Sequence, residues 1–225
     1  MSIKENLEVI QNRIKEAAQK TEREPSDIEL VAVTKLVNIH QIKEAINAGI
    51  KIIGENRVQE AKNKFQQLKD IKWHLIGHLQ KNKVKDAIEI FDIIQSVDKI
   101  ELAEEINKRA GQINKIIDIL IQINISEEES KFGISPSSTL EIIQQISKFK
   151  NIKIRGLMTI APLVSNPEDV RLYFRELAKL KDKITSQKIE NVEMKYLSMG
   201  MSNDFEVAIE EGSNMVRIGR AIFRI

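Results

Sequence analysis

A lysine at the end of an apolar run is the first candidate for chemistry in this sequence. Residues 30–34 are all apolar or β-branched, and Lys35 follows them. Such a run is typical of a buried strand. Side chains alternate along a strand, so Lys35 shares a face with Val31 and Val33. If that face lines the interior of a barrel, the amine needs water, an anion or a covalent partner. The alternative is a lysine whose amine simply reaches solvent.

Two turns near the end of the sequence have the composition of an anion site. The first, residues 198–204, offers the hydroxyls of Ser198 and Ser202 before a predicted helix, whose first N–H groups need acceptors. The second begins at Gly219, where the backbone can approach an anion closely, and Arg220 opens a short helix behind it. Each turn also has a structural interpretation: Ser202 can cap the helix, and Gly219 can form a tight turn that closes the fold.

Two more polar side chains are predicted at the ends of strands. Arg217 alternates with Met215, so one of the two faces inward. An inward arginine can donate to a ring nitrogen, or it can form an ion pair with an acid such as Glu206. Asn56 follows Gly54 at the end of another predicted strand, and it can line a ligand or cap a helix.

The histidines do not predict a metal site. His74 and His78 are four residues apart, but Gly77 lies between them at a presumed turn, and this spacing binds zinc only on a continuous helix. His40 is the third histidine, and the sequence has no cysteine. We therefore expect no metal, no disulfide and no thiolate nucleophile.

Hydrophobic spacing predicts the elements that position these residues. A helix is expected over residues 3–20, followed by eight strands that alternate with helices. The strands are expected at 30–35, 50–53, 73–76, 91–97, 116–125, 152–160, 194–198 and 214–218, and the helices at 39–48, 55–68, 80–88, 99–110, 136–148, 168–180 and 203–211. Eight such units close a barrel, so we predict an α/β fold, a single (β/α)₈ TIM barrel with an extra N-terminal helix, and one domain over residues 1–225. In these barrels the working face is at the carboxyl ends of the strands, and phosphate usually binds after the last two.

Composition argues against several other classes of protein. Hydrophobic residues make up 42% and charged residues 30% of the 225 residues, as in ordinary globular proteins. The net charge is only +2 and aromatic residues are 4%, so nucleic acid is not an expected partner. No apolar run reaches the length of a membrane span, and the N-terminus has no signal-peptide core. We expect a cytoplasmic protein with no membrane partner.

An inward lysine, a phosphate-binding turn and an arginine near a ring together suggest pyridoxal 5′-phosphate (PLP). Its aldehyde condenses with an amine, which removes the cost of burying an ammonium group.

Seven motifs extend this interpretation to a family. They resemble, in order, those of the YggS/PROSC family of pyridoxal phosphate homeostasis proteins, from about residue 5 to the end of the sequence. The motifs are VAVTK (31–35), GENRVQE (54–60), WHLIGHLQ (73–80), SKFG (130–133), RGLM (155–158), LSMGMS (197–202) and VRIGRAIF (216–223). This family is similar to the barrel domain of alanine racemases and is regarded as binding and distributing the cofactor, with no established catalytic activity.

The resemblance implies a role for each candidate residue. Lys35 would form the Schiff base with PLP. The other implied roles are phosphate binding by Ser198 or Ser202 with the backbone of Gly219 and Arg220, contact with the pyridine nitrogen by Arg217, and lining of the ring by Asn56 and Met199. An arginine keeps that nitrogen unprotonated, which narrows the chemistry of the ring.

The favoured function is therefore a PLP carrier that supplies apo-enzymes and is not itself an enzyme. The main alternative is a PLP-dependent amino-acid racemase, which needs a second base opposite the lysine. Alanine racemases take that base, a tyrosine, from an added domain, whereas the tyrosines here are Tyr173 and Tyr196. Because racemases dimerise through the same domain, we expect a monomer. A third possibility is a barrel lyase that uses Lys35 directly on a sugar-phosphate aldehyde and carries no PLP.

Overall fold

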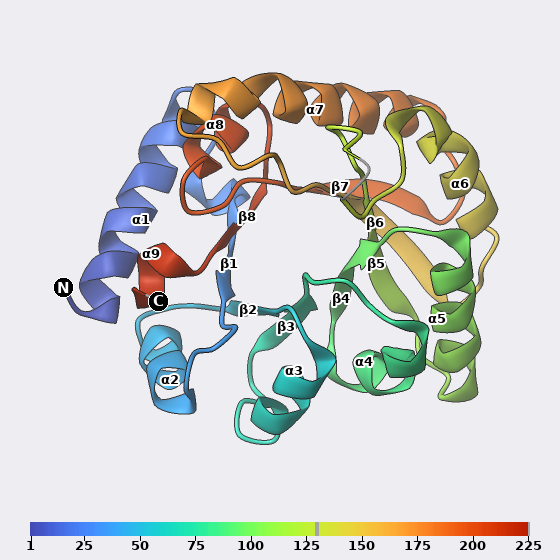
Figure 1. Cartoon of the computed structure of the whole chain (residues 1–225), viewed down its shortest axis with the longest axis horizontal. Coiled ribbons are helices and arrows are strands. Elements are labelled where there is room, and N and C mark those ends of the chain that lie inside the picture. The colour runs from blue at the N-terminus through green and yellow to red at the C-terminus, as the bar shows by residue number, and fades with distance from the viewer. Residues whose placement is uncertain (129–130, 225) are drawn as a thin grey trace.

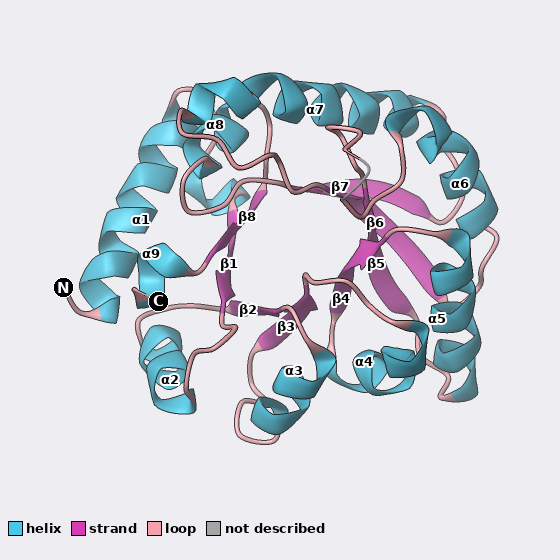
Figure 2. Ribbon diagram, in the orientation of Figure 1, coloured by secondary structure: helices cyan, strands magenta, loops and turns pink. Residues whose placement is uncertain are grey.

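Eight parallel strands close into a barrel in sequence order, and helices surround it. A computed structural model describes residues 1–128 and 131–224. Each strand pairs with its neighbour in the chain, and β8 pairs with β1 to complete the ring (Figure 1; Figure 2). The predicted TIM barrel is confirmed, and so is the extra N-terminal helix. Ser130 of the SKFG motif lies outside the described residues.

All eight predicted strands are present. They are β1 (Glu29–Val33), β2 (Ile52–Glu55), β3 (Lys72–Leu75), β4 (Ile93–Val97), β5 (Ile117–Gln122), β6 (Ile152–Met158), β7 (Val192–Ser198) and β8 (Met215–Ile218). Most predicted strands are longer than the observed ones, because apolar residues continue into the turns where they still pack against the core.

The helices follow the predicted order, and short 3₁₀ turns open several of them. They are α1 (Ile3–Gln19), α2 (Ile39–Asn47), α3 (Val58–Phe65), α4 (Val84–Ile90), α5 (Ile100–Gln112), α6 (Thr139–Ile146), α7 (Arg171–Ser186), α8 (Phe205–Glu210) and α9 (Arg220–Phe223), with 3₁₀ turns at Pro25–Asp27, Lys81–Lys83, Pro136–Ser138 and Pro167–Val170. None of the helices among the described residues combines the length and apolarity that a membrane span requires.

The extra helix α1 contacts two helices near the end of the chain, α8 and α9. Ser2 and Glu5 form a capping box at its start. Asn6 donates to the Ile222 carbonyl (2.8 Å), and Arg13 forms an ion pair with Glu206 of α8 (2.7 Å). Figure 1 accordingly shows α1 beside α8 and α9. The helix thus supports the turn that follows β8.

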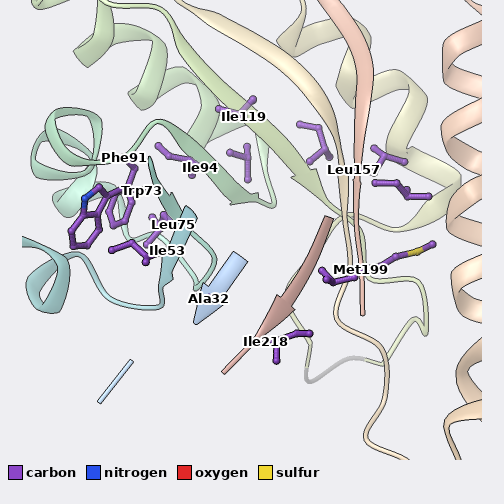
Figure 3. Close-up of a cluster of buried hydrophobic side chains, with 14 of the residues drawn as sticks. Ala32, Ile53, Trp73, Leu75, Phe91, Ile94, Ile119, Leu157, Met199 and Ile218 are labelled. Carbon is purple, nitrogen blue, oxygen red and sulfur yellow. The ribbon is translucent and has the colours of Figure 1, made fainter. Parts of the chain in front are cut away.

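The strands bury both of their faces, in two separate layers. Inward side chains fill the barrel and include Val31, Leu120, Tyr196 and Met215. Outward side chains pack against the helices, as Figure 3 shows for Ala32, Ile53, Leu157 and Ile218 among others. Consecutive strand residues belong to different layers because side chains alternate.

The end of β1 differs from the prediction. A strand was expected to continue to Lys35, but β1 ends at Val33 and Lys35 lies in a turn. The Val37 N–H donates to the Thr34 carbonyl (3.0 Å), which closes a four-residue turn. Leu36, the third residue of this turn, has a φ of 62°, a positive value as in type II turns. The strand thus ends two residues earlier than the apolar pattern predicts, and Thr34, the residue after it, has other partners.

The partners of Thr34 are Glu55 and Lys64, which form a buried ion pair with each other. Glu55 is fully buried and accepts from the Thr34 hydroxyl and from the Lys64 amine, each at 2.7 Å. Lys64 also donates to the Thr34 carbonyl (2.8 Å). The hydroxyl and the carbonyl of Thr34 are therefore both held, and these contacts fix the backbone next to Lys35.

Replacing Lys64 by methionine should lower the free energy of unfolding by about 3–5 kcal/mol, because it leaves the Glu55 carboxylate buried without its cation. Urea denaturation measures the loss. The matched control is Lys62→Met, which removes the partially exposed pair with Asp86 and should cost no more than about 1 kcal/mol. Equal losses for the two variants would contradict a buried charge pair at the end of β1.

Candidate functional site

The closed barrel brings the ends of β8, β1 and β2 side by side. Val31 pairs in register with Arg217 on one side, and Val33 pairs with Gly54 on the other. Gly219 packs so closely on β1 that a Cβ there would lie 3.1 Å from the Val33 Cβ. Residues that follow these strands, far apart in the sequence, therefore meet at one arc of the carboxyl-terminal rim.

Lys35 stands on this arc with an exposed side chain. The sequence allows either an interior amine or one that reaches solvent, and in the structure the residue is open to solvent. Its backbone is held through Thr34, whereas its side chain is accessible. An accessible amine on a fixed backbone can react with a ligand that enters the carboxyl-terminal end of the barrel, which we call the mouth.

Arg217 points into the barrel and is 4% exposed. Met215 also lies in the inner layer, so the expectation that only one of the two faces inward is wrong, because residues two apart on a strand share a face. Its Nη1 donates to the Ser198 hydroxyl (2.6 Å) and its Nη2 to the Thr159 carbonyl (2.7 Å). Among the described residues no carboxylate forms an ion pair with it, and Glu206, the candidate partner, pairs instead with Arg13. Burial lowers the pKa of Arg217 to about 10, against an opposing effect of the Asp204 charge.

A chain of buried side chains leads from Arg217 across the barrel. The Ser198 hydroxyl donates to Gln95 Oε1 (2.7 Å). The Gln95 amide nitrogen lies 3.1 Å from the Met215 sulfur and 2.9 Å from His74 Nδ1. Four strands, β3, β4, β7 and β8, thus contribute to one polar network inside the barrel.

His74 ends this network as a neutral ring. It is almost fully buried, and burial together with the charge of Lys72 lowers its pKa to about 3. A neutral imidazole has one nitrogen that accepts, which allows Nδ1 to receive a hydrogen bond from the Gln95 amide.

The turn after β7 is shaped for close approach by the backbone. Gly200 has a φ of +93°, and a Cβ there would lie 2.6 Å from the Ala208 Cβ. The N-cap of α8 is Asp204, and its carboxylate accepts from the Met201 N–H (2.6 Å), so Ser202 is not the cap. Within the described residues, the Ser202 hydroxyl has no hydrogen-bond partner and its side chain is half-buried. It is free to donate to a ligand.

The second turn begins at Gly219, the N-cap of α9, as predicted. Arg220 is exposed as the first residue of that helix. The first N–H groups of a helix have no intrahelical acceptor. The backbone of both residues is consequently suitable for an anion beside β1.

Asn56 and Met199 differ in their placement. Asn56 Oδ1 is buried and has no hydrogen-bond partner among the described residues, and the N-cap of α3 is Arg57 rather than Asn56. The Met199 side chain, by contrast, lies in the outer core between strands and helices (Figure 3), so it does not line the mouth. It points outward because Ser198, its neighbour, occupies the inward position.

His78 lies apart from His74, so the two do not share a ligand. The His78 ring stacks on Phe132 with centroids 4.1 Å apart, and its Nδ1 is 3.2 Å from the Asp98 carboxylate. His74 is instead inside the barrel. The two rings therefore have different surroundings.

Three members of the network were missed by the sequence analysis: His74, Gln95 and Thr159. A signal was present for Gln95, because a polar residue within the apolar stretch Ile93–Val97 must be buried with a partner. The sequence does not say which partner, since Ser198 lies 103 residues away.

Comparison with known proteins places this architecture in a class. The model of the family described as "Alanine racemase, N-terminal domain" matches residues 5–225. An alanine racemase of Clostridium difficile is 17% identical with a TM-score of 0.73, and the match covers 99% of this chain and 59% of the racemase. At that identity the likeness concerns the fold alone.

More similar relatives narrow the class. The chain is 44% identical over 225 residues to the pyridoxal phosphate homeostasis protein of Aquifex aeolicus, covering 99% of this chain and 98% of the relative. The Escherichia coli protein of that name is 37% identical, with 98% and 95% covered. PipY of Synechococcus elongatus, solved with PLP bound, is 34% identical with a TM-score of 0.82, covering 93% of this chain and 99% of PipY. The chain belongs to the family of pyridoxal phosphate homeostasis proteins.

The buried neutral His74 predicts a pH dependence of stability. Between its ordinary pKa of 6.5 and about 3, the unfolded chain binds a proton at this residue that the folded protein excludes. Its contribution to the free energy of unfolding therefore falls as the pH falls, by about 1.4 kcal/mol per pH unit. In His74→Asn, whose amide oxygen can replace Nδ1 as acceptor, this component should disappear. Urea denaturation from pH 7 to pH 4 compares the slopes, and identical slopes would contradict a neutral His74.

Proposed function

We propose that the protein is a cytoplasmic carrier that binds PLP as a Schiff base on Lys35 and supplies it to apo-enzymes. In this proposal residues 1–225 act as one PLP-binding domain, a monomer without nucleic-acid or membrane partners. The observation that carries the proposal is the Arg217 guanidinium, which is buried without an acid partner among the described residues and lies on the same arc as the accessible Lys35. The names of the relatives and the PLP bound to PipY support it.

The residues present fit the cofactor. PLP has an aldehyde, a pyridine nitrogen and a phosphate, and when bound it supplies an electrophilic carbon and an electron-withdrawing ring. Lys35 offers the amine for the aldehyde, and Arg217 offers a hydrogen-bond donor for the nitrogen. The unpartnered Ser202 hydroxyl and the backbone of Gly219 and Arg220 offer donors for the phosphate. Asn56 Oδ1, buried without a hydrogen-bond partner among the described residues, can accept from a ligand once the atoms that cover it move.

Arg217 also favours binding over catalysis. An arginine that donates to the pyridine nitrogen leaves it unprotonated, which weakens the ring as an electron sink. The hydrogen bonds to Ser198 and Thr159 use donors on both sides of the guanidinium. We infer that the site holds the cofactor in a form of low reactivity and is not that of an enzyme.

The racemase alternative needs a second base at the mouth, and neither tyrosine is placed for that role. Tyr196 points to the opposite end of the barrel, where its hydroxyl lies 3.4 Å from Glu29 at the start of β1. It borders an open cavity of about 600 Å³ together with Arg23 and Asp27. Tyr173 packs on the outer core from α7. These placements favour the carrier.

Titration with PLP tests the attachment. The wild-type protein should develop the visible absorbance of a PLP Schiff base, and Lys35→Ala should lose it, because the variant lacks the amine that the proposal joins to the aldehyde. The matched control Lys43→Ala changes another exposed lysine, on α2, and should keep the band. A band that survives in Lys35→Ala, or none in the wild type, would contradict the proposal, and the latter result would favour a lyase.

Transfer separates the carrier from the racemase. The loaded protein, mixed with a PLP-dependent apo-enzyme and a scavenger of free PLP, should restore more activity than the same amount of free PLP. Incubated with L-alanine, it should show no turnover near or above about 1 s⁻¹, the low end for enzymes. Racemisation at such a rate would favour the alternative.

A further inference from the structure

We propose that Ser198, Gln95 and His74 are positioning residues that hold the Arg217 guanidinium in the mouth, and that Ser198 is not a phosphate ligand. The resemblance to the family left Ser198 and Ser202 as equal candidates for the phosphate. The inference rests on the proposed function only for the identity of the ligand. The hydrogen bonds that run from Arg217 through Ser198 and Gln95 to His74, called the relay below, do not depend on that identity.

The donors and acceptors at Ser198 leave no room for a phosphate. A hydroxyl has one hydrogen to donate, whereas an arginine can only donate. Ser198 Oγ must therefore accept from Arg217 Nη1 (2.6 Å), and its hydrogen goes to Gln95 Oε1 (2.7 Å). A phosphate dianion would need that hydrogen. Ser198 is also fully buried, unlike Ser202.

The rest of the chain fixes the direction of these bonds. A thioether accepts hydrogen bonds and cannot donate, so the Gln95 group facing Met215 Sδ is the amide nitrogen. Its carbonyl oxygen is then turned to Ser198. The same amide nitrogen reaches His74 Nδ1 (2.9 Å), which must be the accepting nitrogen of a neutral ring. Every bond from Arg217 to His74 thus has one allowed polarity.

A second anchor holds the other side of the guanidinium. Arg217 Nη2 donates to the carbonyl of Thr159 (2.7 Å), and the Thr159 hydroxyl donates to the Ile123 carbonyl (2.8 Å). The Arg217 backbone N–H donates to the Gly200 carbonyl (3.0 Å), within the turn that carries Ser202. With both terminal nitrogens held, rotation of the guanidinium plane is blocked. The relay therefore sets the orientation of the cation toward a ligand.

Two probes distinguish a positioning role from a phosphate-binding role. Pyridoxine 5′-phosphate has the ring and the phosphate but no aldehyde, and inorganic phosphate has no ring. Calorimetry should show that Ser198→Ala weakens pyridoxine 5′-phosphate binding about tenfold, the effect of losing one hydrogen bond to a charged group. Its affinity for inorganic phosphate should change less than about twofold. Ser202→Ala should weaken both.

A double-mutant cycle and a matched serine complete the test. In an Arg217→Met background, Ser198→Ala should have no further effect, because it acts through the guanidinium. Ser213→Ala removes another fully buried hydroxyl, whose single hydrogen has the backbone carbonyls of residues 197, 199 and 215 as its possible acceptors among the described residues, and should leave both affinities unchanged. Equal losses for the two probes in Ser198→Ala, or the same loss without Arg217, would overturn the relay.

A measurement on the wild-type protein covers variants that do not fold. Nitrogen-15 NMR should find His74 with Nδ1 unprotonated and Nε2 protonated, and the reverse tautomer would overturn the relay. The proposed function fails separately, if PLP produces no Schiff base at Lys35. If neither probe binds the wild type, the tautomer of His74 decides for or against the relay alone.

Discussion

The candidate site of this barrel is built around a buried cation that forms no ion pair within the part of the chain that the structure describes. Arg217 lies inside the ring of strands, and its contacts are a hydroxyl and a backbone carbonyl. An isolated charge is costly to bury, and dipoles reduce that cost only when they are oriented toward it. Ser198, Gln95 and His74 supply such an orientation from three other strands. The arrangement leaves the cation able to interact with an electron-rich ligand at the mouth.

The fold could be predicted from the sequence because its signals are local. Alternating apolar strands and amphipathic helices, eight times over, allow few topologies other than a closed barrel. The start of α9 at Arg220 followed from the same pattern. The end of β1 did not: the predicted strand reaches Lys35, but β1 ends at Val33, and the hydroxyl and carbonyl of Thr34 bond to Glu55 and Lys64.

Residue types suggested several candidates for the site, but they did not indicate the hydrogen-bond partners of these residues. Residue types located the amine, the arginine and the two turns, and the register of β8, β1 and β2 brings Lys35, Arg217 and Gly219 to one arc. Which serine is engaged could not be read from residue types, since Ser198 and Ser202 have the same side chain. The difference arises from Gln95, a residue 103 positions from Ser198 in the chain. Likewise Met199 is next to an inward residue and for that reason points outward.

The proposed function requires that one amine, that of Lys35, holds the cofactor. Borohydride reduction of the PLP-loaded protein, followed by mass spectrometry of its peptides, identifies the lysine that carries it. We expect a single pyridoxyl adduct, on the peptide that contains Lys35. An adduct on a different lysine, with Lys35 unmodified, would contradict it.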